Sequence, residues 1–302
     1  MHIRHDIPLL LCLCLGMGQT FAATPIQLQR ATSSAPHISI SNIAGTVNVT
    51  AWDRDVVEVS GMLGDGAKPL RITGSNTDLA IKVEAQDGSG WFNWRGDRRM
   101  GSTQLELRVP RAAALSINTV SAPLLIDGTD GGNLDIHTVS GRVRLNARTP
   151  QLKAGSVSGG IELAGHAGQA DLQTVSGDIL APELSQAARL QTVSGRIQAS
   201  GGPWRQLTLS TVSGDVQVSG GMAADGKLAI DSMSGDVQLL LPASTTGTLR
   251  ANSFSGNLRS DFGTPQSAEH GPGSTLDVRL GDGHATLTIE TFSGDLRVRK
   301  GE

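Results

Sequence analysis

The chain has 302 residues, with 25 Lys and Arg against 28 Asp and Glu, so its formal net charge is −3. This near balance argues against a nucleic-acid-binding protein, which would carry a basic surface. There are 38 glycines and no tyrosine, and aromatic residues make up only 3% of the chain. Many turns and a core of Val, Ile and Leu predict an all-β protein.

Residues 1–22 predict a secretory signal peptide. A basic start is followed by the apolar run "IPLLLCLCLGMG", which is too short to span a bilayer, and Thr20 and Ala22 suit the −3 and −1 positions of a cleavage site. We expect cleavage after Ala22 and a periplasmic or secreted mature protein without a transmembrane segment. Because Cys12 and Cys14 both precede the cleavage point, the mature chain would have no disulfide and no thiol ligand or nucleophile.

Residues 23–110 are less regular than the rest of the chain. The stretch "ISISNIAGTVNVTAWDRDVVEVSG" still alternates between apolar and polar residues, as strands do, and contains "SNIAGTV", a weak form of the repeat described below. The open end of a stack of strands exposes unpaired backbone groups and needs a cover. We therefore expect an N-terminal β cap with the first coils in this region.

One segment inside this region, "DGSGWFNWRGDRRMGS", does not follow the strand pattern. Three of the nine aromatic residues of the chain fall within four positions here, next to three arginines. Trp and Arg are enriched where proteins bind partners, and together they suit anionic glycans or lipid headgroups. The alternative is a long hairpin loop whose tryptophans plug the end of the core. The candidate partner contacts are Trp91, Phe92, Trp94, Arg95, Arg98 and Arg99.

We predict a repeat domain over residues 111–302, because one short motif recurs along this stretch. Typical copies are "TVSGDI" at Thr174 and "TFSGDL" at Thr291. The motif serines are separated by 19, 18, 18, 18, 19, 21, 21 and 38 residues, a regular period that is typical of repeat architectures. These serines are Ser121, Ser140, Ser158, Ser176, Ser194, Ser213, Ser234, Ser255 and Ser293.

The unit "LDIHTVSGRVRL" shows how one repeat is built. Its apolar residues alternate before and after the motif, and the alternation slips by one residue between Ile136 and Val139. A strand, a bend at Ser-Gly and a second strand therefore make one unit. We predict a single-domain β-solenoid, like a parallel β-helix, with coils of 18 to 21 residues. The alternative is a stack of β-hairpins that turn at Ser-Gly.

In a solenoid, equivalent residues of successive coils stack in columns. We expect the column before the serines to form the core, and its late growth to Met and Phe to mark a core that widens toward one end. The Thr and Ser column beside it is expected to face outward. The predicted core column is Val120, Val139, Val157, Val175, Val193, Val212, Met233, Phe254 and Phe292; the predicted outward column is Thr138, Ser156, Thr174, Thr192 and Thr211.

The glycine column, from Gly141 to Gly294, predicts a corner that needs a positive φ angle or has no room for a Cβ atom. The residues that follow the glycines mix Arg, Asp, Asn and Gly, which favours solvated turn residues over a calcium site or a catalytic carboxylate pair. We predict no catalytic residue, no metal site and no cofactor. The segment Asp261–Gly273 is predicted to be a loop inserted where one copy of the motif is missing.

The run "LRVPRAAALSINTVSAPLLIDG", followed by serial "TVSGDI" units, resembles the bacterial putative-adhesin domain of unknown function. The resemblance extends over nearly all of the expected mature chain, including "GTVNVTAWDRDVVEV" near its start. It implies a β-solenoid-like fold with serial "SGD" repeats. The family defines no catalytic residues, so only the structural motif carries over.

Together these features predict an exported, non-enzymatic β-solenoid that acts as an adhesin or as a structural or binding protein of the cell envelope. Its expected partners are an envelope glycan, a lipid surface or a protein. Two alternatives stay open. One is a carbohydrate-active solenoid enzyme, which would need a groove with two or three convergent carboxylates. The other is an envelope-stress accessory protein.

Overall fold

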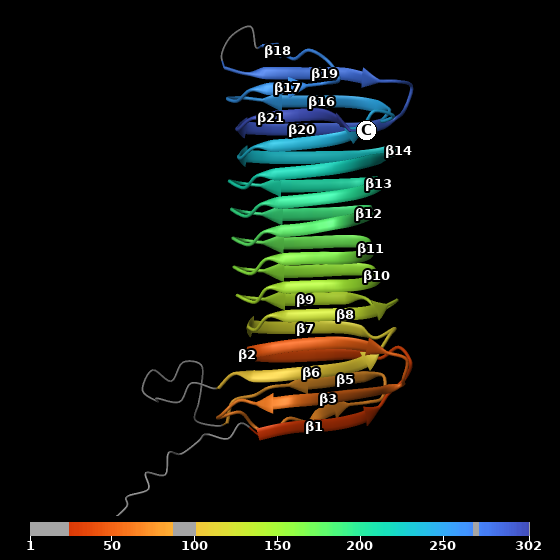
Figure 1. Cartoon of the computed structure of the whole chain (residues 1–302), viewed down its shortest axis with the longest axis vertical. Coiled ribbons are helices and arrows are strands. Elements are labelled where there is room, and N and C mark those ends of the chain that lie inside the picture. Colours follow the sequence, from red (N-terminus) through yellow and green to blue (C-terminus); the bar gives the residue numbers. More distant parts are fainter. Residues whose placement is uncertain (1–23, 87–100, 268–271, 302) are drawn as a thin grey trace, which may run out of the picture.

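The computed structural model describes residues 24–86, 101–267 and 272–301. Every regular element in these ranges is a β-strand, and these residues form no helix long and apolar enough to cross a membrane. The strands stack into a long rod in which each turn of the chain lies above the one before (Figure 1). The prediction of an all-β solenoid is confirmed.

Antiparallel strands close the N-terminal end of the rod. Strand β2 pairs in parallel with β5 and β6 on one side and with β7 and β8 on the other. Strand β3 pairs antiparallel with β6, and β1 pairs antiparallel with β3. Strand β4 pairs antiparallel with β5. The strands are β1 (Thr24–Ala31), β2 (His37–Trp52), β3 (Val56–Leu63), β4 (Ile72–Gly74), β5 (Asp78–Lys82), β6 (Thr103–Pro110), β7 (Ala114–Ser121) and β8 (Leu124–Asp130).

The central coils pair in parallel and in register. Val143 lies opposite Ile161, which lies opposite Ile179, and the same column continues through Ile197 to Val216. A hairpin would pair its own two strands antiparallel, so the stacked-hairpin alternative is wrong. These strands are β9 (Leu134–Thr138), β10 (Val143–Ser156), β11 (Ile161–Thr174), β12 (Ile179–Thr192), β13 (Ile197–Thr211) and β14 (Val216–Ser234).

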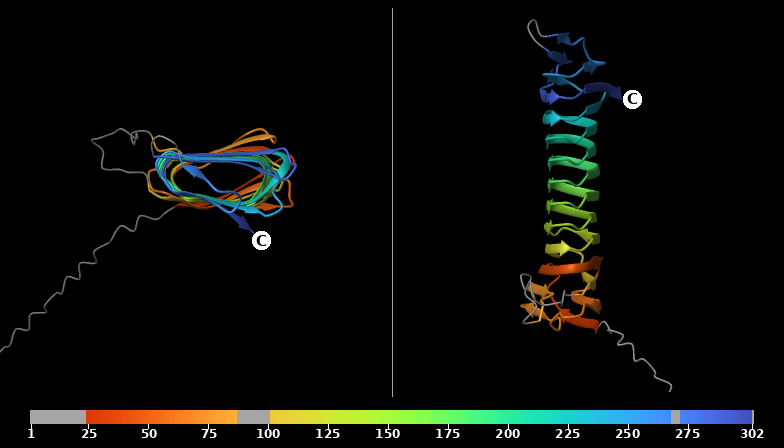
Figure 2. Two further views of the ribbon diagram at one scale, coloured as in Figure 1. Left: turned by 90° about the horizontal axis from the view of Figure 1, so that it is seen from above. Right: turned by 90° about the vertical axis from the view of Figure 1, so that its left-hand side faces the viewer.

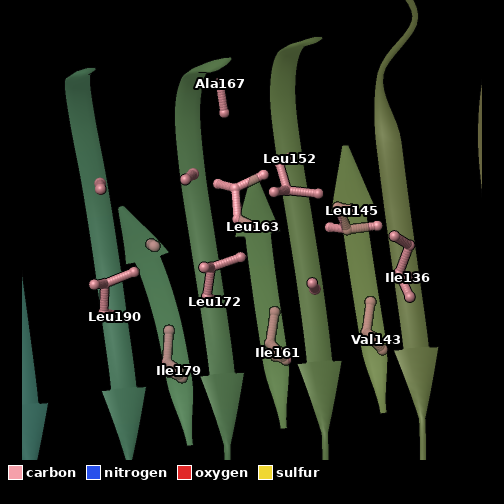
Figure 3. Packing of buried hydrophobic residues seen from close by; sticks show 14 of the residues in the cluster. Ile136, Val143, Leu145, Leu152, Ile161, Leu163, Ala167, Leu172, Ile179 and Leu190 are labelled. Carbon is pink, nitrogen blue, oxygen red and sulfur yellow. The ribbon is translucent and has the colours of Figure 1, made fainter. Parts of the chain in front are cut away.

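Each long strand runs along one broad face, bends, and returns along the other. The first half of β10 pairs with β8 and its second half with β9. Seen along the rod, the coils form a flattened ring (Figure 2). The apolar side chains of both faces point into this ring and fill it with Leu, Ile and Val (Figure 3). Near the bend of β13 the fully buried Trp204 joins the core and donates its indole N–H to the carbonyl of Leu184 at 3.0 Å.

The C-terminal end does not follow chain order. The last coil of the chain, β20 and β21, lies between the coil of β14 and β15 and that of β16 and β17. Strand β19 pairs antiparallel with β16 and with β18. The 38-residue step between the last two motif serines thus contains the antiparallel strand β19 in addition to the predicted loop. The strands are β15 (Val237–Pro242), β16 (Gly247–Ser253), β17 (Leu258–Ser260), β18 (Gln266–Ser267), β19 (Ser274–Leu280), β20 (Ala285–Ser293) and β21 (Leu296–Gly301).

Candidate functional site

The partner contacts expected from the sequence lie outside the residues that the structure describes. Residues 87–100 contain all six of them, so their role stays a prediction. They are Trp91, Phe92, Trp94, Arg95, Arg98 and Arg99. The described part of the chain presents a different candidate, at the edge of the rod where the motif corners stack.

The valine column of the motif lies on the outside of this edge. Its valines are 44–48% exposed and its three larger members 55–59% exposed, apart from the half-buried Val120 at the N-terminal end. The prediction that this column forms the core is therefore wrong, and so is the widening core inferred from it. We call the exposed row the apolar ladder. In stacking order it comprises Val139, Val157, Val175, Val193, Val212, Met233, Phe292 and Phe254.

The Thr and Ser column lies inside the corner, opposite to the prediction. These residues are only 4–8% exposed. Each side-chain oxygen accepts the backbone N–H of the motif glycine three positions later, at 2.8–3.1 Å. A buried N–H without an acceptor costs about 1–3 kcal/mol. A valine in place of the Thr or Ser could not accept this hydrogen bond and would leave the glycine N–H unpaired. The buried residues are Thr138, Ser156, Thr174, Thr192 and Thr211.

The motif glycines make the close stacking of corners possible. A Cβ atom on Gly177 would lie 2.1 Å from the carbonyl oxygen of Gly159, and one on Gly195 would lie 1.8 Å from that of Gly177. The motif glycines are not among those with positive φ angles. Of the two reasons predicted for this column, lack of room for a side chain is the one that applies. Any larger residue would push neighbouring coils apart.

Aspartates that follow the glycines link successive coils. A carboxylate oxygen of Asp215 accepts the N–H of Asp236, Asp236 accepts from Asp295, and Asp295 accepts the backbone and side-chain N–H groups of Asn257, all at 3.0–3.2 Å. The bonds from Asn257, the backbone one first, hold the pKa of Asp295 below its usual value. Asp215 and Asp236 belong to consecutive coils, and the insertion of the last coil places Asp295 next to Asp236.

A groove follows the apolar ladder along the edge. It consists of three hollows of about 360, 480 and 940 Å³. The first and second share His137 and Thr138, and the second and third share Ser210 and Val212, so the hollows follow one another along the edge. The ladder side chains line the groove together with the polar column that precedes the buried threonines, which includes Gln173 and Gln191.

The groove is widest at its C-terminal end, which we call the wide end. The rings of Phe254 and Phe292 stack there with centroids 4.8 Å apart and an angle of 9° between their planes. Met233 lies beside them in the ladder, and Asp231 and Glu290 also line this 940 Å³ hollow. The segment from Pro272 to Thr275, at the start of β19, supplies further lining residues. The wide end thus combines aromatic and carboxylate groups in a space of small-molecule size.

Sequence reasoning missed this site, although a signal for it was present. In the repeats a Thr or Ser lies three positions before the motif glycine, a spacing at which the hydroxyl oxygen can accept the backbone N–H of the glycine. This hydrogen bond would have predicted that the hydroxyl faces inward and the valine outward. Within the described ranges, no group of three or more His, Cys, Asp and Glu side chains could hold a metal ion. What the arrangement can do chemically is bind an apolar ligand.

Comparison with known proteins agrees with this architecture. The chain is similar in structure to a "putative adhesin" from Bacteroides fragilis, with 12% identity, a TM-score of 0.50, and coverage of 92% of this chain and 98% of that one. It is also similar to a "putative lipid binding protein" from Parabacteroides distasonis, with 13% identity, a TM-score of 0.55, and coverage of 92% and 97%. Both likenesses concern the fold.

The comparison with curated protein sequences gives no match. The comparison with family models does. The model of the Toastrack DUF4097 domain matches residues 35–299, which include all the described strands except β1 and the end of β21. The chain therefore belongs to the Toastrack DUF4097 family, whose adhesin-like domain has no established function.

Proposed function

We propose that the protein is an exported, non-enzymatic binding protein of the bacterial cell envelope, of the adhesin type, and that it binds along the apolar ladder. The observation that carries this proposal is the unbroken row of eight exposed apolar side chains along one edge. At ~4.8 Å per coil and a width of ~10 Å the row covers about 350 Å². A patch of this size is comparable to the largest on most monomeric proteins and is often functional.

The dimensions of the ladder favour a thin or flat partner. A stable protein–protein interface buries about 800 Å² on each partner, more than twice the area of the row. A lipid surface can contact a straight row of apolar side chains without a matching shape. The lipid-binding description of the Parabacteroides distasonis neighbour also makes lipid the first ligand class to test.

Two features support binding over catalysis. The wide end contains two carboxylates, Asp231 and Glu290, as a carbohydrate-active enzyme would need. Both are exposed, however, whereas a carboxylic acid that donates a proton near neutral pH is usually held in apolar surroundings. The remaining acidic residues of the corners accept hydrogen bonds from backbone N–H groups and link the coils.

The proposed location is the periplasm or the cell exterior. It rests on the signal-peptide pattern of residues 1–22, which lie outside the described residues. Mass spectrometry of the protein from the periplasmic fraction should find a mature start at Ala23. A chain that retains Met1 in that fraction would contradict export by cleavage.

Flotation with lipid vesicles tests the binding proposal. The wild-type protein should float with vesicles of bacterial envelope lipids, and the triple variant Val157→Thr, Val175→Thr, Val193→Thr should not. The matched control, Leu125→Thr with Leu240→Thr, removes exposed apolar side chains from the broad faces and should float as the wild type does. Equal flotation of all three proteins would exclude the ladder as the binding surface.

A further inference from the structure

The two carboxylates of the wide end lie side by side. Asp231 on β14 and Glu290 on β20 are register partners on adjacent parallel strands. Strands in such a pair are ~4.8 Å apart, and both side chains leave the same face of the sheet. Both are exposed, and both line the 940 Å³ hollow. Like charges placed opposite each other in this way destabilise a sheet.

At several other places on the rod, charges of neighbouring coils complement each other. Lys153 lies in register between Asp135 and Asp171, and Asp171 is also in register with Arg189. Similar complementarity gives the ion pairs Arg144–Glu162 at 3.1 Å and Arg250–Asp277 at 3.2 Å.

Asp231 and Glu290 depart from this pattern. With the residues that the structure describes, neither forms an ion pair or a side-chain hydrogen bond, and they are the only charged residues among those that line the hollow. Among the described residues, the wide end therefore has two carboxylates without an opposite charge beside an apolar surface.

The aromatic rings beside these carboxylates have the same electrostatic preference. The face of a phenylalanine ring attracts a cation, and quaternary ammonium groups are bound in proteins by aromatic side chains. Phe254 and Phe292 form a stack that ends at Phe254, because the next strand outward, β19, runs antiparallel and carries no copy of the motif. Carboxylates and ring faces thus both select a positive charge, while Met233 and the rings offer apolar contact.

We propose that the wide end binds a small organic cation. The ligand is an alkyl- or arylammonium ion whose apolar part contacts Met233 and the phenylalanine rings and whose ammonium group lies beside Asp231 and Glu290. This inference rests on the proposed function only in that both treat the groove as a binding surface. It assigns a different ligand to a different part of the groove, so the two can fail separately.

Calorimetric titration of the mature protein with three small probes tests the proposal. Benzyltrimethylammonium should bind saturably, while benzyl alcohol should bind more weakly and benzenesulfonate not at all. At ~5 Å each carboxylate raises the affinity for a monovalent cation about fourfold even at the dielectric constant of water. The double variant Asp231→Asn, Glu290→Gln should therefore weaken binding of the cation about sixteenfold. Raising the salt concentration to 1 M, where the Debye length is about 3 Å, should have a similar effect on the wild type.

Two further variants separate a specific site from net charge. Glu183→Gln with Asp225→Asn makes the same change in net charge at exposed positions outside the groove and should leave affinity unchanged. Phe254→Leu should weaken binding of the cation severalfold and that of benzyl alcohol less. Equal binding of benzyl alcohol and the cation, or an unchanged affinity in the Asp231→Asn, Glu290→Gln variant, would overturn the proposal. Neither result would bear on vesicle binding by the valines of the ladder.

Discussion

Two single substitutions in one corner, Thr174→Val and Val175→Thr, test which of these two side chains faces the core. Thr174 is 6% exposed and Val175 is 47% exposed. The oxygen Oγ1 of Thr174 accepts the N–H of Gly177 at 3.0 Å and donates to the carbonyl of Gly159 at 3.4 Å. Thr174→Val keeps the side-chain shape but leaves the N–H of Gly177 without its acceptor. Val175→Thr changes only an exposed surface.

The two substitutions should differ clearly in stability. Loss of the acceptor costs about 1–3 kcal/mol, and the added methyl group recovers at most ~0.8 kcal/mol, so Thr174→Val should destabilise the protein by about 1–2 kcal/mol. Val175→Thr should stay within ~0.5 kcal/mol of the wild type. Thermal unfolding followed by circular dichroism resolves this, because 1 kcal/mol shifts Tm by roughly 2–4 °C at this size. A larger loss for Val175→Thr than for Thr174→Val would refute the assigned orientation.

Three further predictions address the corners and the undescribed segment. Gly177→Ala should lower Tm strongly, because its Cβ atom would lie 2.1 Å from a backbone oxygen of the preceding coil, whereas Gly221→Ala, with 3.8 Å to its nearest neighbour, should be tolerated. The pKa of Asp295 is lowered in the folded protein, so the ionised carboxylate stabilises the fold above the unfolded pKa of about 3.9. This stabilisation is lost as the pH falls through the folded pKa. In urea titrations the difference in unfolding free energy between the wild type and Asp295→Asn should therefore disappear below about pH 4. Trp91→Ala with Trp94→Ala should abolish binding to an anionic glycan or lipid at unchanged Tm, and a loss of about 3 kcal/mol instead would identify the two tryptophans as a core plug.

The period of the motif was enough to predict the solenoid. Steps of 18 to 21 residues, alternation on both sides of Ser-Gly and a glycine in all but the first copy favoured stacked coils over stacked hairpins, and the parallel register confirms the coils. The orientation of the corner could not be obtained from alternation alone. Val139 and Ser140 are both exposed, so the alternation slips after Thr138, and hydrophobicity placed the slip two residues too early, after Ile136. The hydrogen-bond requirement of the Gly141 N–H decides the orientation.

The wide end could not be predicted because it depends on the order of the coils in space. Every coil carries a similar motif, so the sequence offers no reason to insert the last coil between two earlier ones. That insertion makes Asp231 a neighbour of Glu290 and places Phe292 between Met233 and Phe254. The wide end is thus a product of tertiary pairing, whereas the ladder is a product of the local repeat.

Site-specific labelling tests most directly whether the apolar ladder is an exposed binding surface. Both natural cysteines lie within residues 1–22, so a mature chain with Val193→Cys or Leu240→Cys would carry a single thiol. The two positions have similar exposure, 44% and 39%. Both should react with a maleimide at similar rates in the free protein, and vesicles of envelope lipids should slow only Val193→Cys. A thiol at position 193 that is unreactive in the free protein, or that reacts equally fast with and without vesicles, would contradict the account.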